Sequence, residues 1–182
     1  MPILISLIIG LLPCVTALSG SPLVTEIPPD QWQPHPGDRM IVDTRDNEGF
    51  LIRQNGEYLR FPVVTGRRSS VTYIGRRYNA TTPVREWEVA SKEIKGDHIT
   101  FGPTGRFFRL STDNSDERTA YGIHEYGYEE KMFAESVRYL SMGCIIVRSK
   151  ILDIIERTYD INEGHLAVST QYGLDPDLFV LR

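Results

Sequence analysis

Short apolar runs interrupted by turn residues limit the fold class of this chain more than any other pattern in its sequence. Arg39–Thr44 reads RMIVDT, and Phe50–Arg53 reads FLIR after the turn-forming sequence DNEG. The dipeptide Asn55-Gly56 then precedes a third run, Glu57–Thr65. Runs of this length suit strands, and Asn-Gly is typical of a β-hairpin turn. The sequence therefore predicts a β-meander at the start of the domain.

Further strand candidates follow at short intervals. After Thr82-Pro83, residues 84–91 (VREWEVAS) have the period of two that is expected of a strand with one wetter face. Gly, Asp, Asn and Ser clusters separate the next candidates, which are Ile99–Phe101, Phe107–Ser111, Ala120–His124, the segment CIIV at 144–147 and the segment LAVS at 166–169.

Two segments have helical rather than strand spacing. The first is Glu129–Leu140, which would place Met132, Phe133, Val137 and Leu140 on one face. The second is Lys150–Tyr159, with Ser149 as its N-cap and Ile151, Ile154 and Ile155 facing inward. The expected fold class is therefore mainly β with one or two short helices.

Length, composition and charge narrow the class of protein. The chain has 182 residues, of which 41% are hydrophobic and 24% are charged, and this suits one globular domain. Its formal net charge is -4, and it has no dense block of Lys and Arg. Because binding to phosphates is largely electrostatic, we do not expect nucleic acid as the main partner.

The N-terminal residues resemble an export signal. Residues 1–17 lack charged side chains, contain an apolar run from Ile3 to Leu12, and end in small residues after Pro13. We expect a signal peptide cleaved after Ala17, with an uncleaved membrane anchor or lipid attached to Cys14 as alternatives. The expected location is the cell envelope, in the periplasm or on the outer face of the cytoplasmic membrane.

A proline-rich segment separates this signal from the predicted domain. Between Ser19 and Asp38 the chain carries Pro22, Pro28, Pro29, Pro34 and Pro36 without a regular hydrophobic period. We therefore expect a semi-extended linker over 18–37, a tether to the signal, and a folded domain over 38–182.

Cys144 is the main candidate for chemistry. If Cys14 leaves with the signal, Cys144 is a lone thiol in an exported protein, either buried and inert or reactive. His124 ends a strand candidate twenty residues earlier, so neighbouring strand ends would bring a base to the thiol. Gly143 would allow a substrate carbonyl to approach, with N–H groups around Met142–Cys144 pointing at an oxyanion.

These residues form a known pattern. His124, sixteen further residues and then Ser141-Met142-Gly143-Cys144 resemble the signature of the L,D-transpeptidase (YkuD-type) catalytic domain. Three shorter segments are also similar to that family: FPVVTG at 61–66, Thr82-Pro83, and Gly-Ile-His at 122–124. The resemblance covers roughly Arg39–Ser169.

The resemblance implies a β-sandwich-like catalytic fold and a peptidoglycan stem peptide as substrate. Cys144 would attack the carbonyl before the terminal D-alanine and form a thioester, and His124 would act as general base and acid, oriented by a backbone carbonyl near Glu125. An amine of a second stem would then give a 3-3 cross-link. Water or a D-amino acid would instead give carboxypeptidase or exchange activity. The activity would belong to peptidoglycan biosynthesis, cell wall biogenesis and cell shape, with neither a metal nor an organic cofactor.

Several positions depart from the family pattern. Met142 stands where members often have His, and Ile146 stands where many carry Arg. Arg148 is a candidate replacement for that cation near a substrate carboxylate, with a surface or helix-start role as the alternative. Glu125 replaces the common Gly or Ser after the histidine, and the glycine usual near Arg85 is missing.

Other residues admit more than one interpretation. Ser141 would bond the active-site backbone, hold the stem peptide or cap a helix. Tyr121, Tyr126 and Tyr128 would line a substrate groove or pack in the core, and 125–140 would form a lid over the thiol. A non-catalytic peptidoglycan-binding module is the alternative of another class. A redox role would need a second cysteine near Cys144.

Overall fold

The computed structural model describes residues 25–112 and 119–174, so the expected signal peptide over 1–17 lies outside the described residues. The chain is mainly β, as expected. One curled sheet has the strand order β11-β9-β8-β7-β12-β1-β2-β3. Its strands are β1 (Arg39–Asp43), β2 (Glu48–Ile52), β3 (Tyr58–Pro62), β7 (Arg85–Ile94), β8 (Arg106–Ser111), β9 (Gly122–His124), β11 (Ile145–Ile146) and β12 (Ala167–Gln171).

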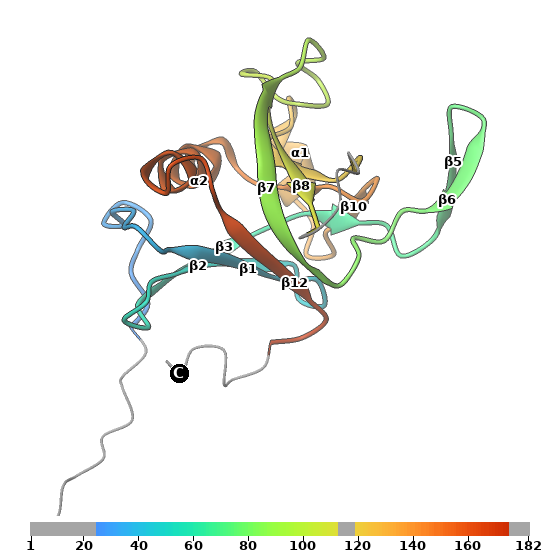
Figure 1. Cartoon of the computed structure of the whole chain (residues 1–182). Helices are drawn as coiled ribbons and strands as arrows, with labels where there is room; N and C mark the ends of the chain where they lie inside the picture. The colour runs from blue at the N-terminus through green and yellow to red at the C-terminus, as the bar shows by residue number, and fades with distance from the viewer. Residues whose placement is uncertain (1–24, 113–118, 175–182) are drawn as a thin grey trace, which may run out of the picture.

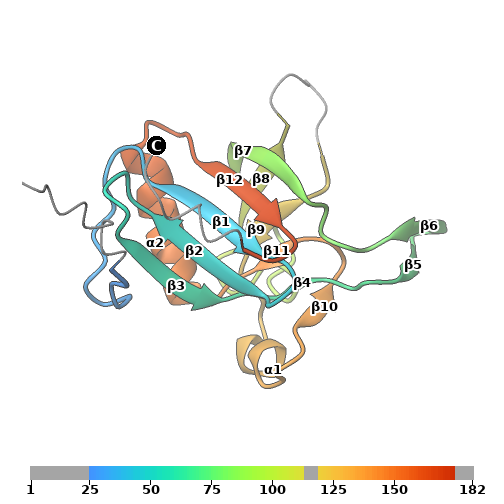
Figure 2. The ribbon, with the colours of Figure 1, turned by 90° about the horizontal axis from the view of Figure 1, so that it is seen from below.

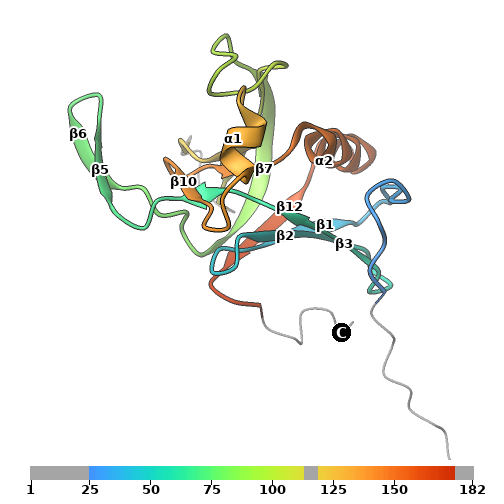
Figure 3. The ribbon, with the colours of Figure 1, turned by 180° about the vertical axis from the view of Figure 1, so that it is seen from behind.

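Two pairs of short strands lie outside this sheet. β4 (Thr65–Gly66) pairs with β10 (Tyr139–Ser141) in parallel, and β5 (Ser70–Tyr73) pairs with β6 (Arg76–Asn79) as an antiparallel hairpin. The hairpin projects away from the rest of the domain in all three views (Figures 1–3).

The expected meander is present as β1, β2 and β3, which pair in sequence order. β12 then joins β1 in parallel and β7 in antiparallel fashion, which links this half of the sheet to β7, β8 and β9. The sheet bends sharply between its halves, so β1–β3 lie across the direction of β7 and β8 (Figure 1). This curl gives the sandwich-like shape that the family resemblance implied.

Both halves of the sheet and one helix share the main hydrophobic core, and Ile41, Phe50 and Ile52 form a smaller cluster of their own. α2 (Ser149–Ile161) lies behind β1, β2 and β3 in Figure 2, along one face of these strands. It buries Ile151, Ile154 and Ile155, as its spacing predicted, together with Leu152. Against these pack residues of β1, β2, β7, β8 and β9, among them Met40, Leu51, Trp87, Phe108 and Ile123.

The prediction for the first helix was wrong beyond its first turn. α1 covers only Glu129–Phe133 and buries no residue, and Tyr139–Ser141 is the strand β10. The reason lies in Arg138, whose guanidinium donates to the carbonyl oxygens of Val63 and Asn47 at 3.0 and 2.9 Å. These bonds hold the backbone beside the first sheet half, where it pairs with β4 instead of continuing the helix.

Three smaller expectations also need correction. Ile99–Phe101 is a turn rather than a strand, because the Asp97 carboxylate accepts from the backbone N–H of Ile99 and Thr100. Ser149 is the first residue of α2, and Arg148 holds the N-cap position. Two points of the expected linker contact the domain, since Glu26 bridges to β3 and Trp32 is only 1% exposed.

Within the described ranges, no helix combines the length and apolar character that crossing a bilayer requires.

Candidate active site

Three adjacent strands place the predicted catalytic residues on one face of the sheet. Phe107 lies opposite His124 and Arg109 opposite Gly122 in the β8–β9 pair. His124 in turn lies beside Ile146 in the parallel β9–β11 pair, which sets Cys144, one residue before β11, beside Gly122. Because residues in register share a face, continuing this register to Cys144 puts it on the same side as His124, one diagonal step away. The core lies on the other side, with Ile123, Ile145 and Phe108.

The imidazole of His124 is buried and held in one tautomer. Its Nδ1 lies 2.6 Å from the carbonyl oxygen of Glu125, and a carbonyl can only accept, so Nδ1 carries the proton. The rings of Phe101 and Phe107 pack on it with centroids 5.1 and 5.9 Å away. Burial lowers the pKa of His124 despite the backbone hydrogen bonds with Glu125 and Thr100, so the ring is neutral near pH 7 and can accept a proton.

The thiol of Cys144 is protonated in this resting site. The residue is half-buried, and its Sγ lies 3.7 Å from the carbonyl oxygen of Ala120. Burial raises the pKa of the thiol to about 11, although the Gly122 backbone and the charge of Arg109 act in the opposite direction. Thiol and imidazole are therefore both neutral. The strand register sets their residues one diagonal step apart, and no hydrogen bond joins these two described side chains.

The turn before the thiol requires glycine. Gly143 has φ +120°, and a Cβ there would come within 2.8 Å of the Tyr121 ring. The buried Ser141 fixes this turn, since its Oγ accepts from the Gly143 N–H at 3.1 Å and donates to the Cys144 carbonyl at 2.6 Å. Ser141 thus bonds the backbone around Cys144, one of its three expected roles, and the Gly143 N–H is already occupied.

The shorter family-like segments meet at the same turn. The buried Thr82 hydroxyl donates to the Gly143 carbonyl at 2.9 Å and accepts from the Gly66 N–H at 2.8 Å. A Cβ on Gly66 would reach 2.9 Å from the Cα of Gly143. The Thr-Gly and Thr-Pro segments, far apart in the sequence, therefore support the backbone that carries Cys144.

Glu125 fastens the loop that covers the imidazole. Its side chain is 0% exposed, and its Oε1 accepts from the Thr104 N–H at 3.0 Å and from the Thr104 hydroxyl. Burial alone would raise the pKa of Glu125, but the nearby Ser149 hydroxyl, the hydrogen bonds from Thr104 and the charge of Arg106 lower it overall. The carboxylate thus holds the 97–105 loop, and with it Phe101, against His124.

The remaining predicted residues are placed less directly. Arg148 pairs with Glu129 and Glu130 at 3.0 and 2.9 Å and caps α2, so it joins α1 to α2 in this structure. Tyr121 packs on Trp87 beside the Gly143 turn. Tyr126 is half-buried with its ring 6.2 Å from that of Tyr128. Its groove-lining role stays a prediction.

Two residues near the thiol were missed in the sequence. Tyr78 reaches in from the hairpin and donates from its hydroxyl to the Met142 carbonyl at 3.3 Å. Arg109 stands on the catalytic face and forms a two-point ion pair with Glu93 at 2.6 and 2.9 Å. Neither residue lies near Cys144 in the sequence. The only sequence signals for their positions are the alternation of side chains along β8 and along residues Val71–Tyr78.

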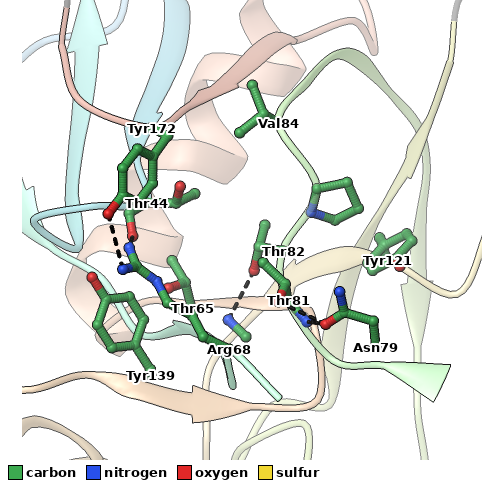
Figure 4. A pocket seen from close by; sticks show the side chains of 12 residues that line it. Thr44, Thr65, Arg68, Asn79, Thr81, Thr82, Val84, Tyr121, Tyr139 and Tyr172 are labelled. Atoms are coloured by element: carbon green, nitrogen blue, oxygen red, sulfur yellow. Dashed lines mark hydrogen bonds between the residues drawn. The ribbon is translucent and has the colours of Figure 1, made fainter. Parts of the chain in front are cut away.

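A cavity of about 590 Å³ lies beside the Gly143 turn, on the side of Tyr121, Thr82 and Gly66. Figure 4 shows Arg68 between the rings of Tyr139 and Tyr172, with centroids 4.0 and 4.7 Å from its Cζ. The guanidinium also donates to the Thr44 carbonyl at 2.8 Å. Neither Cys144 nor His124 lines this cavity.

Across the described ranges, no group of three or more His, Cys, Asp or Glu side chains is arranged to hold a metal ion.

Sequence comparison with known families now bears directly on this site. The chain matches the L,D-transpeptidase catalytic domain family (YkuD) over residues 37–165. That match includes Ser141, Gly143, Cys144 and His124, and it covers more than half of the chain. The chain belongs to this family.

Solved structures agree on the fold. A Xylanimonas cellulosilytica L,D-transpeptidase domain is 15% identical with a TM-score of 0.52, over 76% of this chain and 62% of that one. The Ldtfm-avibactam carbamoyl enzyme is 17% identical with a TM-score of 0.50, over 76% and 49%. Bdellovibrio bacteriovorus Bd1075 is 14% identical with a TM-score of 0.50, over 77% and 49%. The chain thus spans about half to three fifths of their lengths. No curated protein matches the chain.

Proposed function

We propose that this member of the L,D-transpeptidase family is a peptidoglycan L,D-transpeptidase whose nucleophile is the Cys144 thiol. The observation that supports the proposal is the shared face of β8, β9 and β11, which sets the neutral imidazole of His124 one diagonal step from the Cys144 thiol. A binding module would have no use for this buried base beside a thiol held by a glycine turn.

The neutral pair suggests how the first step proceeds. Nε2 of His124 takes the thiol proton as Sγ attacks the stem-peptide carbonyl before the terminal D-alanine. The C–N bond then breaks, the proton passes to the leaving amine, and a thioester remains on Cys144. Backbone N–H groups of the Met142–Cys144 turn stabilise the oxyanion, and the Gly143 N–H must leave Ser141 Oγ to contribute.

The second step decides the product. An amine of a second stem peptide, deprotonated by the same Nε2, attacks the thioester and gives a 3-3 cross-link. Water attacking instead gives the shortened stem, which is L,D-carboxypeptidase activity, and a D-amino acid gives exchange. All three share one acyl-enzyme, and the access of water to Cys144 selects among them.

The test is a product assay on disaccharide-tetrapeptide. The wild type should release D-alanine and form cross-linked dimer. His124→Ala should lower the rate by about 10²–10⁴-fold with the fold intact. Shortened monomer without dimer would assign carboxypeptidase activity. A folded wild type that binds the peptide but releases nothing would contradict the enzyme and favour the binding module.

We further propose that the protein acts in the cell envelope after export. The support is the uncharged apolar N-terminal sequence, and the substrate class lies in the same compartment. Cell fractionation of the tagged full chain would check this, with recovery in the cytoplasm as the contradicting result.

A further inference from the structure

The β5–β6 hairpin is built unlike the rest of the domain. None of its residues is buried, and its strands pair only with each other. Figures 1 and 3 show it standing clear of the sheet beside β10. A two-stranded hairpin is marginally stable by itself, so an unpacked hairpin next to a catalytic site is suited to contact something else.

Strand register divides the hairpin into two faces. Val71 pairs with Tyr78 and Tyr73 pairs with Arg76, so these four side chains share one face. The other face carries Ser70, Thr72, Arg77 and Asn79. Val71 and Tyr78 are half-buried, whereas the residues of the second face are exposed. The first face is therefore the inner one.

This inner face begins at the proposed nucleophile. The Tyr78 hydroxyl donates to the Met142 carbonyl at 3.3 Å, two residues before Cys144. Burial raises the pKa of Tyr78, and the nearby Cys144 adds to that shift. From Tyr78 the inner face extends outward to Tyr73 and Arg76. It therefore forms a wall beside the proposed catalytic site, made of Val71, Tyr73, Arg76 and Tyr78.

Arg76 is the cation of this wall. The side chain of Arg76 forms no ion pair or hydrogen bond with any residue that the structure describes, whereas the side chains of Arg67 and Arg68 donate to the carbonyl oxygens of Leu140 and Thr44. The adjacent Arg77 has the same charge and exposure but points to the outer face. The chain as a whole is acidic, at -4, so a basic wall here is a local feature.

We infer that the inner face of the β5–β6 hairpin binds a carboxylate-bearing stretch of the stem peptide, with Arg76 as the carboxylate-binding residue and Tyr73 and Tyr78 beside the peptide backbone. This rests on the proposed function for the identity of the peptide. A guanidinium binds a carboxylate with two hydrogen bonds. Tyrosine combines an apolar ring with a polar hydroxyl, which suits a peptide that has both apolar side-chain carbons and amide groups. Stem peptides carry free carboxylates, so the charges are complementary.

Arg76 and Arg77 provide a matched pair for the test. Arg76→Gln and Arg77→Gln are each made in the full chain carrying Cys144→Ala, so that binding is measured without turnover. Calorimetric titration uses disaccharide-tetrapeptide with free carboxylates and the same peptide with its carboxylates amidated. We expect Arg76→Gln to raise the Kd for the free peptide about tenfold, Arg77→Gln to leave it within twofold, and amidation to abolish the difference.

Several outcomes would overturn the inference. Equal losses of peptide affinity in both variants would indicate general attraction of an acidic ligand. Unchanged affinity in both variants would show that the inner face does not bind the peptide. If neither variant changes peptide binding but both lose binding to phosphatidylglycerol vesicles, the hairpin contacts a membrane surface instead. An inactive wild type whose peptide binding still depends on Arg76 would contradict the proposed function and leave this inference standing.

Discussion

The proposed catalytic edge, formed by β8, β9 and β11, and the β5–β6 hairpin both border Cys144, but they are stabilised in opposite ways. The edge places Phe108 and Ile123 in the common core and His124 under aromatic rings, all nearly inaccessible to solvent. The hairpin buries no residue and contacts the site through Tyr78. Chemistry needs groups held in fixed geometry, whereas a contact surface for a long peptide can adapt. The site thus combines a rigidly packed sheet edge with a hairpin that buries none of its residues.

The largest difference should appear in global stability. Phe108 is fully buried and packs edge-on against Tyr159, with ring centroids 5.7 Å apart. We expect Phe108→Ala to lower the free energy of unfolding by about 3–5 kcal/mol, because it leaves a cavity in the core. Tyr73→Ala on the exposed hairpin should stay within about 0.5 kcal/mol. Urea denaturation measures both free energies of unfolding. Similar losses of stability in the two variants would contradict the difference between the packed edge and the hairpin.

The thiol should react slowly in the folded protein. Since burial raises the pKa of Cys144 to about 11, its thiolate is scarce at neutral pH. We expect alkylation by iodoacetamide at pH 7.5 to be about two orders of magnitude slower than for a thiol of pKa about 8.5, and to rise with pH toward the shifted pKa. Peptide mapping separates Cys144 from Cys14, and denatured protein is the control. Fast alkylation that is flat above pH 7 would instead indicate a thiolate–imidazolium pair.

Glu125 should stabilise the catalytic edge through its loop. We expect Glu125→Gln to cost about 1–3 kcal/mol, because the buried amide keeps only part of the hydrogen bonding to Thr104. The pKa of Glu125 is lowered in the folded state, so its contribution is present above the unfolded value of about 4.3 and is lost as pH falls through the folded value. Thermal unfolding from pH 7 to pH 3 measures this.

The control for that experiment is Glu130→Gln, whose side chain is 89% exposed and pairs with Arg148. This variant should change the free energy of unfolding by less than about 0.5 kcal/mol. Its stability should depend on pH in the same way as that of the wild type. A larger loss of stability from Glu130→Gln than from Glu125→Gln would show that the α1 ion pairs, and not the bonds of Glu125 to the 97–105 loop, stabilise this edge.

The smallest effect concerns the tip of the hairpin. Ile74 has φ +47° and precedes Gly75 at φ +70°, the sign pattern of a hairpin turn that favours Asn-Gly and strains a β-branched residue. We expect Ile74→Asn to stabilise the hairpin by about 1 kcal/mol and to slow amide exchange in β5 and β6 roughly fivefold. Because the hairpin opens locally, the global unfolding midpoint should not move. A raised midpoint would show that it is coupled to the core.

The same contrast explains which features the sequence predicted. Strands β1–β3 and helix α2 were predicted because their apolar periods correspond to buried faces, and the family motif indicated His124 and Cys144. The helix expected over 129–140 failed because its apolar residues are not buried and Arg138 bonds across to Val63 and Asn47. The β5–β6 hairpin was missed because its alternation has no buried side to reveal it. Contacts such as Thr82 with Gly143 join segments 61 residues apart, which no local pattern encodes.

The most direct test of the account is the intact mass of the protein after mixing with disaccharide-tetrapeptide. The account predicts an adduct on the wild type equal to the peptide less D-alanine, mapped to Cys144, and none on Cys144→Ala. His124→Ala should form the same adduct far more slowly. A folded wild type that releases D-alanine without any adduct on Cys144, or a Cys144→Ala variant that remains active, would contradict it.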